Sequence, residues 1–188
     1  MSLLHQRSPY RYHVDRFVCA WLPTAPGLTG LDVGGPSPQS RPFDQEWTCI
    51  NPDPGALADY LGFAEDLGTF CEKEFDVVQA TDMLYLVQNV PKAMGEIRRV
   101  LRPGGTLVAS VPCVWPPASD ADWGRWPKAR WAAVVSVAGF ADVTVTPLGG
   151  AWSLVEQVWH NWLDWWPPIL CRLDRQMAWP LAYGIVAR

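Results

Sequence analysis

The sequence has few charged residues and no long hydrophobic run, and each shortage excludes a class of protein. Charged residues make up 18% of the 188 positions and hydrophobic residues 49%, which is too apolar a composition for a disordered chain. No apolar run approaches the ~20 residues of a transmembrane helix, and no apolar segment near the N-terminus has the form of a signal peptide. The formal net charge of -4 gives no basic surface of the kind that binds nucleic acid.

Cysteine and histidine are also sparse. The five cysteines are odd in number, lie far apart and never form a C-x-x-C pair, so the sequence predicts neither a disulfide framework nor a zinc site. His160 and Asp164 are spaced i, i+4 in a predicted helix, but no third metal ligand accompanies them. We therefore expect reduced thiols, a cytoplasmic location and no bound metal.

The most informative stretch, residues 74–112, has the pattern of a strand, a helix and a second strand. Phe75–Val78 is a short apolar run of the kind found in buried parallel strands. From Pro91 to Leu101, apolar residues recur on one helical face and charged residues on the other. Pro103-Gly104-Gly105 then ends the helix, and residues 106–111 form a second apolar strand. Such a βαβ unit predicts an α/β fold, and the chain length fits one domain.

The residues of this stretch resemble the class I S-adenosylmethionine (SAM)-dependent methyltransferases, and in particular their type 11 methyltransferase domain. In that family, Phe-Asp and two hydrophobic residues precede a helix ending E-I-x-R-V-L-x-P-G-G and an apolar strand ending in proline. This chain matches at Phe75–Val78, Glu96–Gly105 and Leu107–Pro112. The resemblance implies a Rossmann-like three-layer α/β sandwich around a seven-stranded, mostly parallel sheet whose last strand is antiparallel. It also implies one domain over residues 1–188, with a core of about 28–148 and 181–188 and a Trp-rich helical insertion of about 151–178.

The turn after the first predicted strand, residues 28–33, matches the cofactor signature of this family. Its members place an acidic residue, one further residue and then glycine here, and Asp32, Gly34 and Gly35 fit this pattern. Glycine lets the amino-acid end of SAM approach bare backbone, and a carboxylate suits the ammonium and sulfonium charges. A dinucleotide-binding G-x-G-x-x-G motif is absent, so SAM is expected as the cofactor rather than NAD or FAD.

The chain departs from the family at two positions that usually contact SAM. The second predicted strand ends at Asn51, where the family normally has Asp or Glu to accept hydrogen bonds from the ribose hydroxyls. Asp53 is an alternative acceptor, unless residues 51–55 are merely a turn. Phe63 stands where the family has an aspartate that accepts from the adenine amino group. The resemblance implies these further cofactor contacts: Phe63, Ala64, Glu65, Gln79 and Ala80.

Three residues are candidates for the base that methyl transfer to a hydroxyl would use. Asp82 follows the fourth predicted strand, where such enzymes sometimes carry a cleft residue, but it could also cap a helix or lie on the surface. His13 lies on a helix predicted from Tyr10 to Leu22, where a lone histidine usually serves packing. The third candidate, Asp122, belongs to a Pro- and Trp-rich loop.

That loop also carries the candidate substrate contacts Trp123 and Arg125. An Asp and an Arg three residues apart, flanked by aromatic residues, suit a sugar or polar ring that needs stacking and directional hydrogen bonds. They equally suit an internal salt bridge between Asp122 and Arg125 that shapes the loop.

A tryptophan stripe follows near the C-terminus. Its members are spaced 3, 4, 3 and 4 residues apart, as on one face of a helix: Trp152, Val155, Trp159, Trp162 and Trp166. The stripe could form a lid over the substrate cleft, a homodimer surface or an interfacial helix on lipid. An interfacial helix needs a polar face rich in Lys and Arg, so packing or dimerisation is favoured.

Together these features predict a SAM-dependent methyltransferase that acts on a hydroxyl of a sugar or another small molecule. The alternative is a methyltransferase-like chain that has lost catalysis and serves as a binding or regulatory subunit, and Pro36, Asn51 and Phe63 motivate it. An enzyme should have an open, cofactor-sized cleft beside Gly34. A scaffold should have that cleft filled, for example by Phe63 or by tryptophan side chains.

Overall fold

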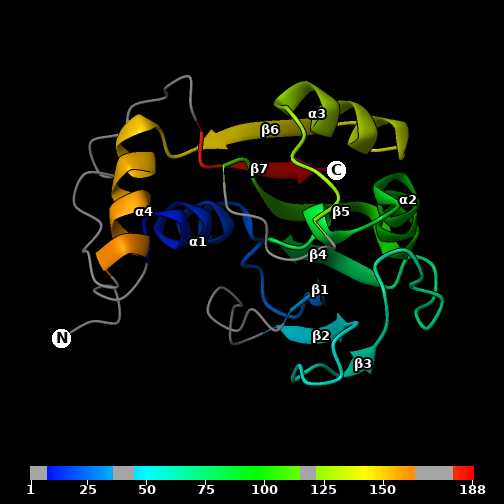
Figure 1. The fold of residues 1–188 in the computed structure, drawn as a ribbon. Helices are drawn as coiled ribbons and strands as arrows, with labels where there is room; N and C mark the ends of the chain where they lie inside the picture. Colours follow the sequence, from blue (N-terminus) through cyan, green and yellow to red (C-terminus); the bar gives the residue numbers. More distant parts are fainter. Residues whose placement is uncertain (1–7, 36–44, 115–121, 164–179) are drawn as a thin grey trace.

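The computed structural model describes residues 8–35, 45–114, 122–163 and 180–188, which form a seven-stranded sheet flanked by helices (Figure 1). The strand order is β3-β2-β1-β4-β5-β7-β6. In chain order the elements are α1 (Pro9–Trp21), β1 (Thr29–Val33), β2 (Glu46–Asn51), β3 (Tyr60–Leu61), β4 (Phe75–Thr81), the 3-10 helix η3 (Leu84–Leu86), α2 (Val90–Val100), β5 (Leu101–Pro112), α3 (Lys128–Val137), β6 (Val143–Leu148), α4 (Ala151–Leu163) and β7 (Ala182–Ala187).

Five adjacent strands, from β3 to β5, run parallel, whereas β7 is antiparallel to both of its neighbours, β5 and β6. β1 and β4 are buried along most of their length, as expected for parallel strands with helices on both faces. The predicted three-layer α/β fold, with a mostly parallel seven-stranded sheet and an antiparallel last strand, is confirmed.

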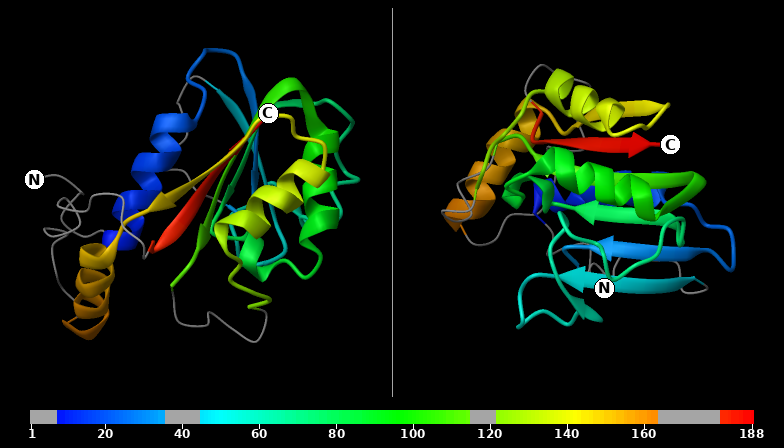
Figure 2. Two further views of the ribbon diagram at one scale, coloured as in Figure 1. Left: turned by 90° about the horizontal axis from the view of Figure 1, so that it is seen from above. Right: turned by 90° about the vertical axis from the view of Figure 1, so that its right-hand side faces the viewer.

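α2 and α3 cover one face of the sheet (Figure 2). α2 begins after Asn89, whose side-chain oxygen accepts a hydrogen bond from the Lys92 N–H, and Pro91 occupies its first turn. Ile97 is fully buried, whereas Lys92 is exposed on the opposite side of the helix. The larger hydrophobic core lies between these helices and the sheet.

α1 covers the other face of the sheet (Figure 2). The Ser8 hydroxyl accepts a hydrogen bond from the Arg11 N–H at the start of this helix, and Pro9 follows the cap. Phe17 packs so closely on β7 that a Cβ atom at Gly184 would lie 2.4 Å from its ring. A smaller hydrophobic core therefore joins α1 to β5, β6 and β7.

α4 stands beside α1 at the edge of the molecule that lies away from α2 and α3 (Figure 1). Two hydrogen bonds join the helices: His13 Nε2 and Ser153 Oγ lie 2.8 Å apart, and the Tyr10 N–H donates to Gln157 Oε1 over 2.9 Å. The predicted Trp-rich helix is thus present as far as Leu163, and the rest of the predicted insertion lies outside the described residues. None of the helices that the structure describes has the length and hydropathy needed to cross a lipid bilayer.

Tyr60–Leu61 forms the short edge strand β3, which pairs with the end of β2. One local feature differs from the sequence prediction. Pro103-Gly104-Gly105 lies within the span of β5 instead of before it. The ladder pairs Phe75 with Leu101 and then shifts register before the next pair, so residues 102–105 bulge out of the strand.

Candidate functional site

A cleft of about 530 Å³ opens at the carboxyl ends of β1, β2 and β4. Gly34 follows β1, Asn51 ends β2, and Asp82 follows β4, and all three line the cleft. From β1, the chain adds β2 and β3 on one side and then β4 and β5 on the other. The strand order therefore reverses between β1 and β4. Ligands of open α/β sheets bind at such a switch point.

The cleft lining combines acidic and apolar side chains. Asp53, Glu65 and Asp82 line it, and no basic side chain does so in the part of the chain that the structure describes. Phe63 and Trp123 contribute aromatic surface. A cavity with this chemistry suits a ligand that carries positive charge and a flat apolar group.

The turn after β1 is built around the backbone of Gly34. Its φ of 84° lies in the left-handed region, and its N–H donates to the carbonyl of Ile50 over 2.8 Å. A Cβ atom at this position would lie 2.7 Å from the Cβ of Met83. Glycine is therefore required here both by backbone conformation and by the close approach of the segment after β4.

The side chain of Asn51 fastens this turn to the end of β2. Its Nδ2 donates to the carbonyl oxygens of Gly34, over 3.1 Å, and of Gly35. Its Oδ1 accepts from the Asp53 N–H over 2.9 Å. The N–H donors of the Asn51 side-chain amide thus form hydrogen bonds within the protein. A carboxylate at position 51 would face two carbonyl oxygens with no proton to share, so asparagine fits this turn better than the usual acidic residue.

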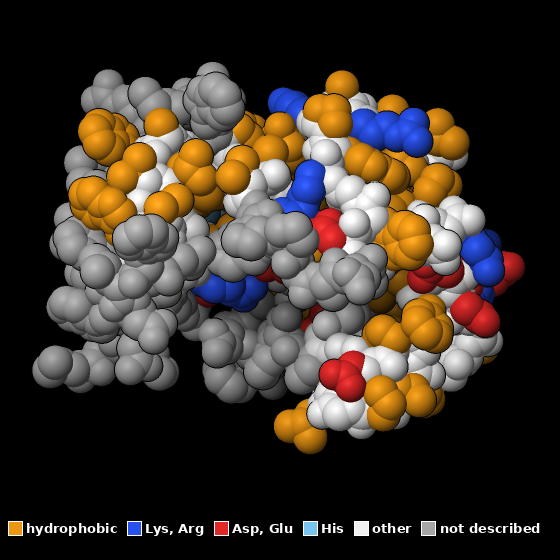
Figure 3. All heavy atoms as spheres, viewed as in Figure 1, with side chains coloured by type: hydrophobic (Ala, Val, Ile, Leu, Met, Phe, Trp, Pro, Cys, Tyr) orange, Lys and Arg blue, Asp and Glu red, His pale blue; other side chains and the backbone are white. Residues whose placement is uncertain are grey.

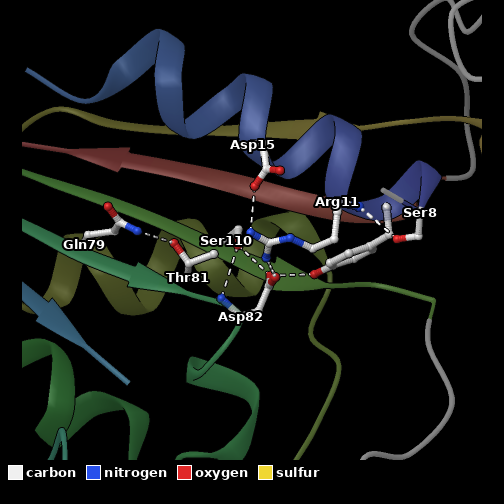
Figure 4. Close-up of polar contacts among 8 residues, drawn as sticks. Ser8, Arg11, Asp15, Gln79, Thr81, Asp82 and Ser110 are labelled. Atoms are coloured by element: carbon white, nitrogen blue, oxygen red, sulfur yellow. Dashed lines mark hydrogen bonds and ion pairs between the residues drawn. The ribbon is translucent and has the colours of Figure 1, made fainter. Parts of the chain in front are cut away.

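A polar network holds Asp82 at the end of β4 (Figure 4). Oδ1 accepts from the Tyr10 hydroxyl and from the Ser110 hydroxyl, each over 2.6 Å, and Oδ2 accepts from Arg11 Nη1 over 2.9 Å. Arg11 also pairs with Asp15 on the next turn of α1, over 2.7 Å. The φ of Asp82 is 53°, a left-handed conformation that aspartate tolerates better than most residues. Three donors on one carboxylate fix its orientation.

A second cavity, of about 270 Å³, adjoins the first at Asp82. Tyr10, Arg11 and Tyr85 line it. Burial raises the pKa of Tyr10 well above its ordinary value, and the charge of Asp82 adds to this effect. Burial and Asp82 raise the pKa of Tyr85 in the same way. Both phenols therefore stay protonated at neutral pH and can serve as hydrogen-bond donors.

One known family matches part of the chain. Residues 37–109, which end in the middle of β5, match the family described as methyltransferase domain. The match covers 73 of the 188 residues, and over this segment the chain is similar to SAM-dependent methyltransferases. The predicted resemblance is therefore confirmed, and SAM is the methyl donor in this family.

Solved structures of methyltransferases share the fold of this chain at low sequence identity. One is a chain in the complex of the Haloferax volcanii Trm112 methyltransferase activator with a methyltransferase. It is 18% identical, with 94% of this chain and 89% of that chain covered and a TM-score of 0.71. A SAM-dependent methyltransferase from Archaeoglobus fulgidus is 12% identical, with 94% and 93% covered and a TM-score of 0.66. Phosphoethanolamine N-methyltransferase 2 from Haemonchus contortus, solved in complex with SAM, is 15% identical, with 95% and 51% covered and a TM-score of 0.62. No curated protein matches the sequence.

Five of the residues predicted to bind SAM line the cleft: Gly34, Asn51, Phe63, Ala64 and Glu65. The other four lie behind this lining. Asp32 is fully buried beneath the turn, and a Cβ atom on Gly35 would lie 2.1 Å from its Oδ2. Gln79 and Ala80 are also fully buried within β4, where Gln79 Nε2 donates to Thr81 Oγ1 over 3.1 Å.

The structure does not bring all the candidate catalytic and substrate residues together. Asp82 lines both cavities, whereas His13 and Asp122 are absent from the described lining of either. His13 contacts Ser153 on α4. Asp122 forms an ion pair with Arg125, whose guanidinium stacks 4.9 Å from the centre of the Tyr85 ring. These contacts fit the interpretation that Asp122 and Arg125 form an internal salt bridge that shapes the loop.

Sequence reasoning did not identify three residues that hold Asp82. Tyr10 and Arg11 come from α1 and Ser110 comes from β5, 72, 71 and 28 positions away in the chain. The i, i+4 spacing of Arg11 and Asp15 was a local signal of an ion pair, but it did not indicate that Arg11 reaches β4. Only the packing of α1 across the sheet brings these side chains to the site.

Proposed function

We propose that the methyltransferase transfers a methyl group from SAM to a hydroxyl of a small polar acceptor, such as a sugar, bound in the cavity beside Asp82. The observation that carries this proposal is that two cavities adjoin at one carboxylate. The cleft of about 530 Å³ is the proposed cofactor site, and the cavity of about 270 Å³ is the proposed acceptor site.

The residues of the larger cleft fit SAM. Asp53 and Glu65 complement a sulfonium and an ammonium group, and Phe63 and Trp123 offer surface to an adenine ring. When bound, SAM supplies a methyl group activated by the positive charge on sulfur. The protein's own contribution is to hold the acceptor oxygen in line with that methyl group and to exclude water.

Asp82 is the proposed contact for the acceptor hydroxyl. A carboxylate offers about four lone-pair directions, and three are taken by Tyr10, Arg11 and Ser110. The remaining direction can accept a hydrogen bond from the acceptor and receive its proton as the new carbon–oxygen bond forms. The ring of Tyr85, which lines the same cavity, suits the apolar face of a sugar.

A binding or regulatory subunit without catalysis is the second candidate. It is motivated by Asn51, whose amide is occupied by the glycine turn, and by Phe63, which replaces an acceptor of the adenine amino group. The open cleft beside Gly34 favours the enzyme, because a scaffold should have that space filled. The Haloferax volcanii neighbour forms a complex with an activator. By analogy, we also propose that a partner protein assists this chain.

Calorimetric titration with SAM and with S-adenosylhomocysteine tests the cofactor site. We expect micromolar binding that Gly34→Ala weakens at least about tenfold, because the substitution imposes left-handed strain and a clash with Met83. Gly27→Ala is the matched control. Gly27 has a similar φ of 75° but has open space around it. Absence of SAM binding at millimolar ligand would overturn the proposed enzymatic function. The binding or regulatory subunit would then be the remaining candidate.

The acceptor site is tested separately with Asp82→Asn. We expect this variant to bind SAM within a few-fold of the wild type, and to form S-adenosylhomocysteine at least about a hundredfold more slowly with a panel of sugar acceptors. Equal turnover by the variant would show that Asp82 does not contact the acceptor, whatever the result of the binding experiment.

A further inference from the structure

Asn51 ends β2 at the position where the family normally has Asp or Glu, and its side chain is bonded to the protein itself. Its Nδ2 donates to the carbonyl oxygens of Gly34 and Gly35, and its Oδ1 accepts from the Asp53 N–H over 2.9 Å. Its backbone carbonyl accepts from the Gly62 N–H over 3.1 Å. These hydrogen bonds tie together the turn after β1, the end of β2 and the segment that follows β3.

An amide satisfies both sides of this position, and a carboxylate does not. The two carbonyl oxygens need donors, whereas the Asp53 N–H needs an acceptor. Turning the amide over would set oxygen against oxygen and N–H against N–H. A carboxylate would meet the same carbonyl oxygens with no proton to donate, and they would repel its charge. The turn therefore requires asparagine at position 51, so the loss of the acidic residue there is not in itself a sign of a lost cofactor site.

Asp53 is the carboxylate that remains available next to this turn. It lines the cleft two residues beyond the end of β2 and is exposed to solvent. Its Oδ1 accepts from the Gly55 N–H over 2.8 Å, and its side chain forms no other hydrogen bond among the described residues. A carboxylate offers about four lone-pair directions, so about three remain for a ligand. The bonds of Asn51 to the Asp53 N–H and of Gly55 to Oδ1 hold this carboxylate in place.

The surroundings of Asp53 favour neutral hydroxyl donors as its ligand. The sequence has no Lys or Arg from position 45 to position 72. Figure 3 shows acidic and hydrophobic side chains over β2 and β3. A phosphate would be repelled there, whereas two adjacent hydroxyls can donate to the two oxygens of one carboxylate. In SAM, such a pair of hydroxyls belongs to the ribose.

We propose that Asn51 and Asp53 divide the role that one acidic residue has in the family: Asn51 positions the glycine turn, and Asp53 receives the ribose hydroxyls of SAM. The assignment of Asp53 rests on the proposed function, because it needs SAM in the cleft. The assignment of Asn51 does not, because its hydrogen bonds lie within the protein. The charge of Asp53 also acts on the sulfonium at longer range, but its directional contacts are with hydroxyls.

The same substitution at two positions tests the role of Asn51. Asn51→Asp should lower the melting temperature of the ligand-free protein by at least about 4 °C at pH 7, because the new carboxylate faces two carbonyl oxygens. This loss, relative to the wild type, should shrink as the pH falls toward about 4, since the carboxyl then binds a proton and can donate it. Asn89→Asp is the control, because Asn89 accepts from the Lys92 N–H and aspartate caps a helix equally well. Equal melting temperatures for both variants at pH 7 would overturn the role of Asn51.

Calorimetric titration with S-adenosylhomocysteine and with its 2′-deoxy analogue tests the role of Asp53. We expect the wild type to prefer S-adenosylhomocysteine at least about tenfold, since the analogue lacks a hydrogen bond to a carboxylate. Asp53→Ala should reduce this preference to about twofold or less. Asn51→Asp should weaken both ligands by a similar factor and keep the preference, because it disturbs the glycine turn and not the ribose contact. Glu65→Ala removes another carboxylate from the same cleft and should also keep the preference, whatever its effect on affinity.

Three further results would overturn the proposal. A wild type that binds both ligands equally makes no contact with the 2′-hydroxyl, although the cofactor site is then confirmed. An Asn51→Asp variant that binds S-adenosylhomocysteine more tightly, with a larger preference over the analogue, shows that position 51 faces the ribose. A wild type that binds neither ligand overturns the proposed cofactor site together with the role of Asp53, while the melting temperatures still decide the role of Asn51.

Discussion

The two faces of the sheet are covered in different ways. On one face, α2 and α3 bury apolar residues such as Ile97 and Trp131 and direct charged residues outward. On the other face, among the described residues, α1 packs on the strands, and α4 joins α1 through polar groups and through Leu154, which packs against the smaller core. The first face is arranged for stability. The second holds Asp82, the proposed acceptor contact, so the proposed function lies where the packing departs from the usual pattern.

The largest effect on stability is expected on the α2 side. Ile97→Ala empties a fully buried position in the larger core, and we expect a loss of about 2–5 kcal/mol in the free energy of unfolding. Lys92→Ala, on the exposed side of the same helix, should change it by less than about 0.5 kcal/mol. Urea denaturation of both variants measures the difference. A small effect of Ile97→Ala would mean that this face of the sheet is not the stabilising one.

A smaller and pH-dependent effect is expected where α2 meets the loop before β4. Hydrogen bonds from Arg99 lower the pKa of Glu96, whose carboxylate also accepts from the Leu67 N–H over 3.0 Å. Because the folded pKa lies below the ordinary value of about 4.3, this stabilisation is complete above that value and is lost as the pH falls through the folded pKa. Glu96→Gln should therefore cost about 1–2 kcal/mol at pH 7 and progressively less below about pH 4. Urea denaturation at pH 7 and below about pH 4 measures the cost of Glu96→Gln. A cost independent of pH would contradict the lowered pKa assigned to Glu96.

The smallest effect on stability, but a larger one on function, is expected on the α1 side. Tyr10→Phe removes one donor to Asp82 and leaves the ring in place, so the free energy of unfolding should fall by less than about 1.5 kcal/mol. Turnover should fall about tenfold with SAM affinity nearly unchanged, because Asp82 loses part of its fixed orientation. Tyr12→Phe on the same helix is the matched control, since the Tyr12 hydroxyl contacts only Arg16 among the described residues. Equal turnover by Tyr10→Phe and Tyr12→Phe would show that Tyr10 does not contribute to the proposed acceptor site.

The sequence was sufficient to predict the fold because its signals are local. The strand of Phe75–Thr81, the helix of Val90–Val100 and the end of β5 at Pro112 follow from apolar spacing, proline and glycine within one stretch. The cleft was predictable in outline for a related reason. Gly34 and Asn51 both end parallel strands, and such ends meet at one edge of the sheet.

The remaining parts of the site depend on tertiary packing that no local pattern records. Which of the helical residues Tyr10, Arg11 and His13 would reach Asp82 depends on how α1 rotates and slides on the sheet, and that is fixed by contacts such as Phe17 on Gly184. The orientation of the tryptophan stripe was open for the same reason. Periodicity shows that the residues share a face, but here the polar groups of α1 decide that the opposite face turns inward.

The polar contacts between α1 and α4 have a consequence for local opening of the molecule. Besides Leu154, which packs against the smaller core, α4 meets α1 through Gln157 and Ser153, so separating the two helices exposes far less apolar surface than unfolding the domain. The sensitivity of an opening reaction to urea scales with the surface it exposes. The amide hydrogens of α4 should therefore exchange with solvent through a subglobal opening whose rate hardly responds to denaturant. Those of β4 and β5, in the middle of the sheet, should exchange only when the whole domain unfolds. We therefore expect α4 to behave as a separate cooperative unit that opens while the sheet and the cleft remain folded.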